Sequence, residues 1–69
     1  MDKKLLKAKI WAAGERQADL AKALDLTPTR FSAKMTGYKN GDFSVKEILT
    51  IRDRYKLTNE ELLEIFFNE

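Results

Sequence analysis

The chain has no cysteine and no histidine among its 69 residues. These two absences exclude disulfide bonds, cysteine or histidine metal ligands, cysteine nucleophiles and histidine general bases. No acidic cluster is spaced for an oxygen-ligated ion, and neither a nucleophile–base pair nor a glycine-rich phosphate loop is present. We therefore expect a protein that is not an enzyme and that needs no metal or cofactor.

Long apolar runs are also missing. No stretch approaches the roughly 20 residues of a membrane span, and no signal-peptide pattern opens the sequence. The lack of cysteine is typical of a reducing compartment. We expect a cytoplasmic protein without membrane contact, built as one domain over residues 1–69 with a small hydrophobic core.

Charge is unevenly distributed along the chain, although the net charge is only +2. Residues 1–40 contain nine basic and four acidic side chains, which gives +5, whereas residues 41–69 contain four basic and seven acidic side chains, which gives −3. A basic first half favours an anionic partner on one face of the molecule. An ordinary charged surface is the alternative.

Single glycine and proline residues separate short amphipathic stretches, which predict five helices and no strand. The expected ranges are about 3–12, 16–24, 28–36, a helix from the Ser44 cap to about 56, and 59–67, with a loop over 37–42. Ser44 with Glu47 and Thr58 with Glu61 have the spacing of capping boxes. Gly14 stands where a left-handed helix end is expected.

Helical spacing predicts which apolar side chains face inward. These are Leu6, Ile10, Ala13, Leu20, Ala21, Leu24, Phe31, Met35, Ile48, Ile51, Tyr55, Leu62 and Phe66. Trp11, Leu63, Ile65 and Phe67 are left over. Either Trp11 covers the core and only Phe67 stays exposed, or these residues form a contact with a second copy or another protein through the last helix and its neighbours.

Residues 17–36 fit a helix-turn-helix, which needs two short helices crossing over a tight turn. Ala21 is the small residue at the crossing, Asp25 tolerates a positive φ, and Leu26 and Phe31 are apolar anchors. The second helix begins with a Thr27 cap followed by Pro28 at its first position. A plain helical hairpin in a small bundle is the alternative.

The segment Gln17-Ala18-Asp19-Leu20-Ala21-Lys22-Ala23-Leu24, with residues 27–37, resembles the Cro and repressor helix-turn-helix proteins of temperate phages. The whole chain is similar to short Cro-like regulators of phages of Gram-positive bacteria, through Glu47-Ile48-Leu49-x-Ile51 and the aromatic carboxyl end. The resemblance implies a compact five-helix, lambda-repressor-like DNA-binding domain. It also implies a transcription regulator, usually dimeric, that binds operator DNA in a lysis–lysogeny circuit in the bacterial cytoplasm. The helix over 28–36 would enter the major groove, and the helix over 16–24 would cross the backbone.

Matched by position, the resemblance implies DNA contacts from Gln17, Thr27, Pro28, Thr29, Arg30, Ser32, Ala33, Lys34, Tyr38, Lys39 and Asn40. The base-facing positions are Pro28, Thr29, Ser32 and Ala33. Readers of guanine and adenine are typically arginine, lysine, asparagine or glutamine, so these small side chains predict weak direct readout. Specificity would then depend on DNA shape, on Arg30 or on bridging water.

The other positions correspond to backbone contacts. Gln17, Thr27, Arg30 and Lys34 would reach phosphates, and Lys39 and Asn40 would touch the backbone from the loop, as would Tyr38 unless it packs on the core. Solvated surface is the alternative for the polar side chains, and capping alone is the alternative for Thr27. If about five phosphates are neutralised, log affinity falls with log salt with a slope of about −4.5.

Two functions fit these residues. The basic first half favours a DNA-binding regulator that recognises double-stranded operator DNA. The small side chains on the 28–36 helix favour an antirepressor on the same fold, which would bind a partner phage repressor and modulate repression.

Overall fold

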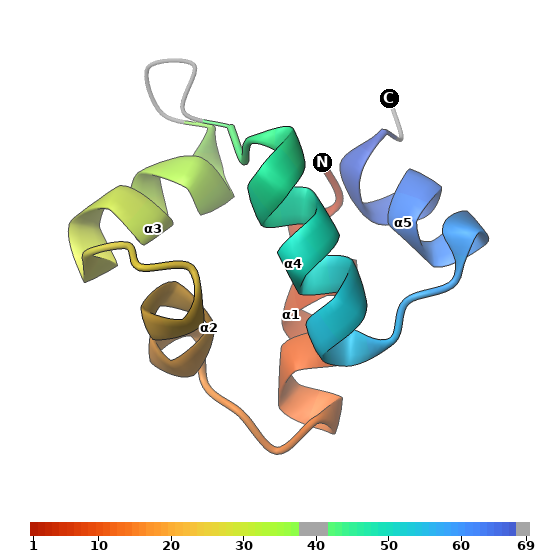
Figure 1. Ribbon diagram of the computed structural model, residues 1–69, viewed down its shortest axis with the longest axis horizontal. Helices are drawn as coiled ribbons and strands as arrows, with labels where there is room; N and C mark the ends of the chain where they lie inside the picture. The colour runs from red at the N-terminus through yellow and green to blue at the C-terminus, as the bar shows by residue number, and fades with distance from the viewer. Residues whose placement is uncertain (38–41, 68–69) are drawn as a thin grey trace.

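The computed structural model describes residues 1–37 and 42–67, which form five helices and no strand. In chain order these are α1 (Lys3–Ala12), α2 (Gln17–Ala23), α3 (Pro28–Thr36), α4 (Val45–Tyr55) and α5 (Asn59–Phe66) (Figure 1). The prediction of an all-α chain with five helices is confirmed for this part of the sequence, and where helix ends differ from expectation they differ by a single residue. None of the described helices is both long and apolar enough to cross a bilayer.

Hydrogen bonds at the predicted capping boxes start α4 and α5. The Glu47 backbone N–H donates to Ser44 Oγ at 3.2 Å, and the Ser44 N–H donates back to Glu47 Oε1 at 2.8 Å. Thr58 and Glu61 repeat this pattern at 3.1 and 3.0 Å. Each box satisfies two backbone donors that a helix start would otherwise leave free, so these starts follow from the local sequence.

The starts of α1 and α2 use acidic side chains that the sequence pattern did not single out. Asp2 caps α1, with Oδ1 accepting from the Leu5 N–H at 3.1 Å. At α2, the Arg16 N–H donates to the Asp19 carboxylate at 2.8 Å. Both carboxylates also lie at the positive end of a helix dipole, which favours their charge.

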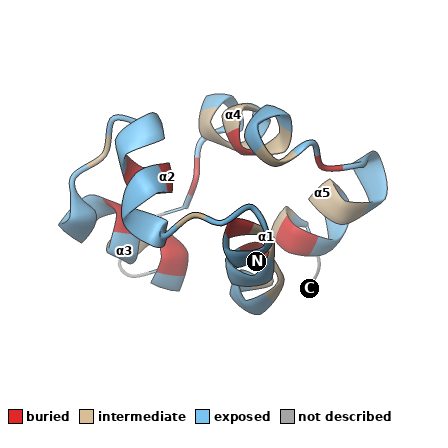
Figure 2. Ribbon diagram, turned by 90° about the horizontal axis from the view of Figure 1, so that it is seen from below, coloured by how far each residue is buried: buried red, intermediate tan, exposed pale blue. Residues whose placement is uncertain are grey.

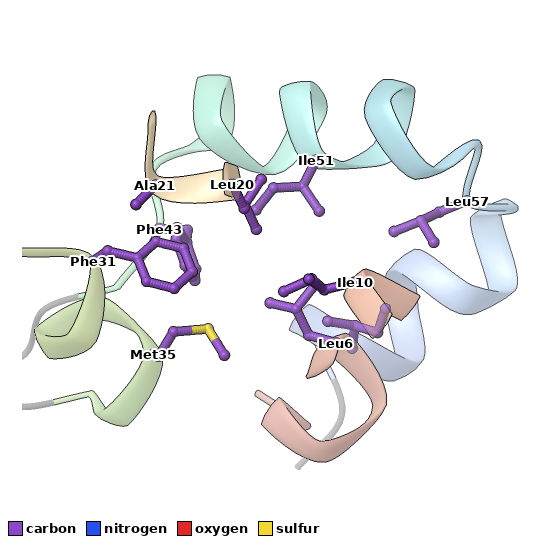
Figure 3. Packing of buried hydrophobic residues seen from close by; sticks show 10 residues of the cluster. Leu6, Ile10, Leu20, Ala21, Phe31, Met35, Phe43, Ile51 and Leu57 are labelled. Carbon is purple, nitrogen blue, oxygen red and sulfur yellow. The ribbon is translucent and has the colours of Figure 1, made fainter. Parts of the chain in front are cut away.

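One cluster of buried side chains holds the helices together. It contains Leu6, Ile10, Leu20, Ala21, Phe31, Met35, Phe43, Ile51, Leu57 and Ile65 (Figure 3). The Phe43 ring meets the Phe31 ring edge-on at a centroid distance of 5.9 Å and the Phe66 ring at 6.1 Å. Phe43 therefore links α3 to α5 through edge-to-face contacts of the kind aromatic pairs prefer.

Two expectations about burial are corrected, and one buried residue, Leu57, was not anticipated. Ile65, expected among the leftover residues, is fully buried, because its carbonyl accepts the Asp2 N–H at 2.6 Å and the start of α1 lies against this part of α5. Ala13, expected inward, is exposed, because α1 ends at Ala12 and the helical stripe stops there. Leu57, in the α4–α5 link, joins the core after a left-handed Lys56 turns the chain.

Trp11, Leu63 and Phe67 remain outside the core. Their exposed fractions are 81, 56 and 61%. The interpretation in which Trp11 covers the core and only Phe67 is exposed is therefore wrong.

Both ribbon views place α2 and α3 at one end of the molecule and α5 at the other, with α1 between them (Figures 1 and 2). The radius of gyration is 10.9 Å. This agrees with the value of about 11 Å expected for a folded chain of this length. The described residues therefore form a compact all-α globule.

Candidate functional site

The connection between α2 and α3 adopts the predicted tight turn. Asp25 has a φ of 58°, in the left-handed region that its sequence position was predicted to need. The Leu26 N–H donates to the Ala21 carbonyl at 2.9 Å, which closes the turn onto α2. Ala21 is buried, and its small side chain lets the two helices approach.

The helix α3 is held to the core along one side only. Thr27 caps its start by accepting the Arg30 N–H at 3.2 Å, Pro28 occupies the first position, and Gly37 ends it with a φ of 71°. Phe31 and Met35, one turn apart, are both buried and point into the cluster (Figure 3). These two anchors set which face of α3 is turned outward.

The outward face of α3 is made of short side chains, several of which carry a hydroxyl group. Pro28, Thr29, Ser32, Ala33 and Thr36 line a shallow hollow on this face. The Thr36 hydroxyl donates to the carbonyls of Ser32 and Ala33 at 3.1 and 3.3 Å and is thus bound to its own helix. The hydroxyls of Thr29 and Ser32 are exposed and make no hydrogen bond to another described residue, so they are available to a ligand.

Three further predicted site residues of the α2–α3 unit are exposed. Gln17 is the first residue of α2, Thr27 precedes α3, and Arg30 lies in its first turn. Among the residues that the structure describes, Arg30 forms no ion pair. Its guanidinium is therefore available to an anion.

Lys34, the other predicted cation of α3, is bound within the chain. Its ammonium lies 2.8 Å from Glu47 Oε1 and donates to the Asp42 carbonyl at 3.4 Å. Burial raises the pKa of Glu47, but the hydrogen bonds from Lys34 and from the Ser44 backbone outweigh it and hold that pKa below its ordinary value. Lys34 thus ties α3 to the first turn of α4, a contact between residues 13 positions apart that the sequence did not indicate.

Predicted contacts from Tyr38, Lys39 and Asn40 fall outside the described residues. Of the remaining predicted site residues, the structure brings Pro28, Thr29, Ser32 and Ala33 together on one face, and Gln17, Thr27 and Arg30 are exposed elsewhere in the same α2–α3 unit.

A second polar cluster joins the α1–α2 link to the end of α4. The Arg54 guanidinium donates to Glu15 from Nε at 3.0 Å and from Nη2. This contact lowers the pKa of the Glu15 carboxyl. Burial, and after it the close approach of the Glu15 carboxylate, raises the pKa of the neighbouring Tyr55 to about 12, although the two side chains do not meet at hydrogen-bonding distance and angle. The Tyr55 hydroxyl is buried and finds no hydrogen-bond partner among the described residues.

Comparison with protein-family models, with curated proteins and with solved structures gives no match. Within the described part of the chain, no group of three or more acidic side chains gathers in a way that would hold a metal ion. The function is therefore argued from the α2–α3 surface itself.

Proposed function

We propose that the chain binds duplex DNA through α3 and regulates transcription, as a Cro- or repressor-type protein of a phage lysis–lysogeny switch. In this proposal α2, the turn at Asp25 and α3 form a helix-turn-helix of a lambda-repressor-like domain. The observation that carries the proposal is the exposed hydroxyl face of α3, held outward by the buried Phe31 and Met35. A helix that packs on the core by one side and is exposed on the other can enter a major groove, which is wide enough to admit an α-helix.

Backbone contacts would come from the residues around that face. The start of α3 leaves the backbone N–H of Thr29 without a partner among the described residues, beside the Thr27 hydroxyl, and helix starts favour phosphate. Arg30 adds a cation without an ion pair in the described part of the chain, and Gln17 adds an exposed amide. Such contacts orient a protein on DNA without reading its sequence.

Base readout would rest on short side chains. Thr29 and Ser32 can each make a single hydrogen bond to a base edge, and Ala33 can touch a thymine methyl. None of them makes the two-pronged contacts of arginine or glutamine. Sequence preference would therefore come in part from DNA shape and deformability.

Mobility shift of phage promoter DNA at about 50 and 200 mM salt tests the proposal. We expect the chain alone to shift the DNA, more strongly at the lower salt. Replacing Thr29 and Ser32 together by alanine should weaken binding about tenfold, the effect of about 1.4 kcal/mol. The matched control is Thr50→Ala, which removes a hydroxyl that is bound to the Lys46 carbonyl within α4 and should leave binding unchanged.

A second candidate function is an antirepressor that binds a partner repressor through α3. It is favoured by the partly apolar hollow between Pro28 and Ala33 and by the engagement of Lys34 with Glu47, which leaves α3 with little free charge. If the chain fails to shift DNA alone but changes the shift caused by a phage repressor, and Thr29→Ala with Ser32→Ala removes that change, this second function replaces the first.

A further inference from the structure

An exposed stripe on α1 combines positive charge with an aromatic ring. Lys4, Lys7, Ala8 and Trp11 follow the i, i+3, i+4, i+7 spacing that places side chains on one helix face, and all four are exposed. The opposite face of α1 carries Leu6 into the core. These four residues are called the α1 stripe below.

An exposed stripe on α5 has the same spacing and the opposite charge. Glu60, Leu63 and Glu64 of α5 and Phe67, which caps the carboxyl end of this helix, again follow i, i+3, i+4, i+7, and all four are exposed. The buried side of α5 is occupied by Ile65. These four residues are called the α5 stripe. Two stripes of equal length, each with two like charges and one aromatic ring, are complementary surfaces.

The chain already pairs these two helices through the same chemistry within one molecule. Lys9 of α1 forms an ion pair with Glu61 of α5. The two lysines of the α1 stripe and the two glutamates of the α5 stripe form no ion pair among the described residues. The stripes therefore expose charge and apolar area that no described residue covers, a feature typical of interaction surfaces.

We propose that the α1 stripe of one copy of the chain docks against the α5 stripe of a second copy. With the two helices aligned in the same direction, lysines face glutamates and Trp11 faces Phe67. Charge complementarity favours a second copy as the partner, because the acidic α5 stripe provides the counter-charges that the basic α1 stripe lacks. Interfaces of the standard size bury about 800 Å² per partner with 20–30 residues on each side, so stripes of four residues predict weak, reversible association.

Neither stripe contains a residue of α3. Figure 1 shows α5 at the opposite end of the molecule from α3. Because the two docking surfaces differ, the contact is heterologous, and it extends into larger assemblies unless the rotation closes a ring. Self-association and DNA binding are therefore separable: replacing Thr29 and Ser32 should leave self-association at the wild-type level whether or not the chain binds DNA.

Trp11 is the only tryptophan, and at 81% exposed it reports directly on the contact. Sedimentation velocity up to about 1 mM chain covers the range in which a small interface associates. We expect the mass-average size to rise with concentration and the Trp11 emission to shift to shorter wavelength in parallel. Trp11→Ala and Phe67→Ala should each weaken association at least threefold, whereas Val45→Ala, an exposed apolar control on α4, should not.

Charge reversal gives the sharper test. The variant K4E/K7E carries two acidic stripes and the variant E60K/E64K carries two basic ones, so each alone should remain monomeric. Their equimolar mixture should associate again, in about 150 mM salt, where charges beyond about 8 Å are screened. Circular dichroism of each variant checks that its helices are folded.

Three outcomes would overturn the proposal. They are a wild-type chain that stays monomeric at the highest concentration, Val45→Ala weakening association as much as Trp11→Ala, and a mixture of folded charge-reversed variants that stays monomeric.

Discussion

The ammonium of Lys34 and the backbone N–H of Ser44 both donate to Glu47 Oε1, each at 2.8 Å. One carboxylate oxygen thus serves as the cap of α4 and as the anchor of α3. The side chains of Lys34 and Glu47 are only 19 and 14% exposed, so this pair is screened less than a surface ion pair.

This arrangement predicts a measurable coupling between the two residues. Lys34→Ala should lower the free energy of unfolding by about 1 kcal/mol, since it leaves a partly buried carboxylate without its cation. A double-mutant cycle with Glu47→Gln, measured by urea denaturation, should give an interaction energy of about 0.5–1 kcal/mol. Lys22→Ala removes an exposed lysine of α2 and is the control. Additive effects of the two variants would contradict the coupling.

The lowered pKa of Glu47 predicts how stability depends on pH. A carboxyl whose folded-state pKa lies below the ordinary value of 4.5 contributes stability that is present above that value and is lost as pH falls through the folded-state pKa. The pKa values of Glu15 and Glu61 are lowered in the same direction by Arg54 and Lys9. The free energy of unfolding should therefore fall on acidification below the ordinary glutamate range, and less steeply in Glu47→Gln. Identical pH profiles for the two proteins would rule out a contribution from Glu47.

The buried hydroxyl of Tyr55 predicts an unusual substitution. Because this hydroxyl has no partner among the described residues, Tyr55→Phe removes a desolvated polar group and keeps the ring. We expect the free energy of unfolding to stay unchanged or to rise by up to about 1 kcal/mol. A loss of more than about 1 kcal/mol in thermal or urea unfolding would show that the hydroxyl makes a stabilising hydrogen bond.

The same residue makes a prediction at alkaline pH. A tyrosine whose folded-state pKa is raised from 10.0 to about 12 contributes stability that is present below pH 10 and is lost as pH rises toward 12. Wild-type protein should therefore lose more stability over this range than Tyr55→Phe, as urea denaturation at each pH would show. Parallel losses in the two proteins would mean that Tyr55 ionises as freely in the folded chain as in the unfolded one.

Local features of this fold could be predicted from sequence because they depend on neighbours within four residues. The caps at Thr27, Ser44 and Thr58 and the left-handed Asp25 follow from short-range hydrogen bonding and backbone preference. Phe31 and Met35 were identified as buried because α3 has a single apolar side. The side of α3 that does not carry these two residues could then be predicted to be exposed.

Features that depend on tertiary contacts could not be predicted in this way. Ile65 and Leu63 lie at opposite edges of the apolar side of α5, so periodicity alone could not tell which of the two is buried. The contact of Lys34 with Glu47 and that of Glu15 with Arg54 join residues on different helices. The sequence therefore could not show that, among the described residues, Lys34 forms an ion pair and Arg30 does not.

The contrast between Ile65 and Leu63 gives a stability prediction with a built-in control. Ile65→Ala should lower the free energy of unfolding by about 2–4 kcal/mol, because it opens a cavity beneath α1. Leu63→Ala removes a side chain that is already 56% exposed and should change stability by less than about 1 kcal/mol. Urea unfolding at neutral pH measures both. Equal losses would mean that α5 presents a different face to the core.

Salt dependence distinguishes the two cations of α3 if the chain binds DNA. Each phosphate neutralised contributes about −0.9 to the slope of log affinity against log salt. Arg30 has no ion pair in the described part of the chain and should contribute fully, so Arg30→Ala should reduce the slope by about 0.9. Lys34→Ala should change the slope far less, since its ammonium is already neutralised by Glu47. Lys56→Gln, at the carboxyl end of α4, removes the same charge far from α3 and should leave the slope unchanged. If instead Lys34→Ala lowers the slope as much as Arg30→Ala, then DNA draws Lys34 away from Glu47, and α3 must separate from the first turn of α4 when it binds.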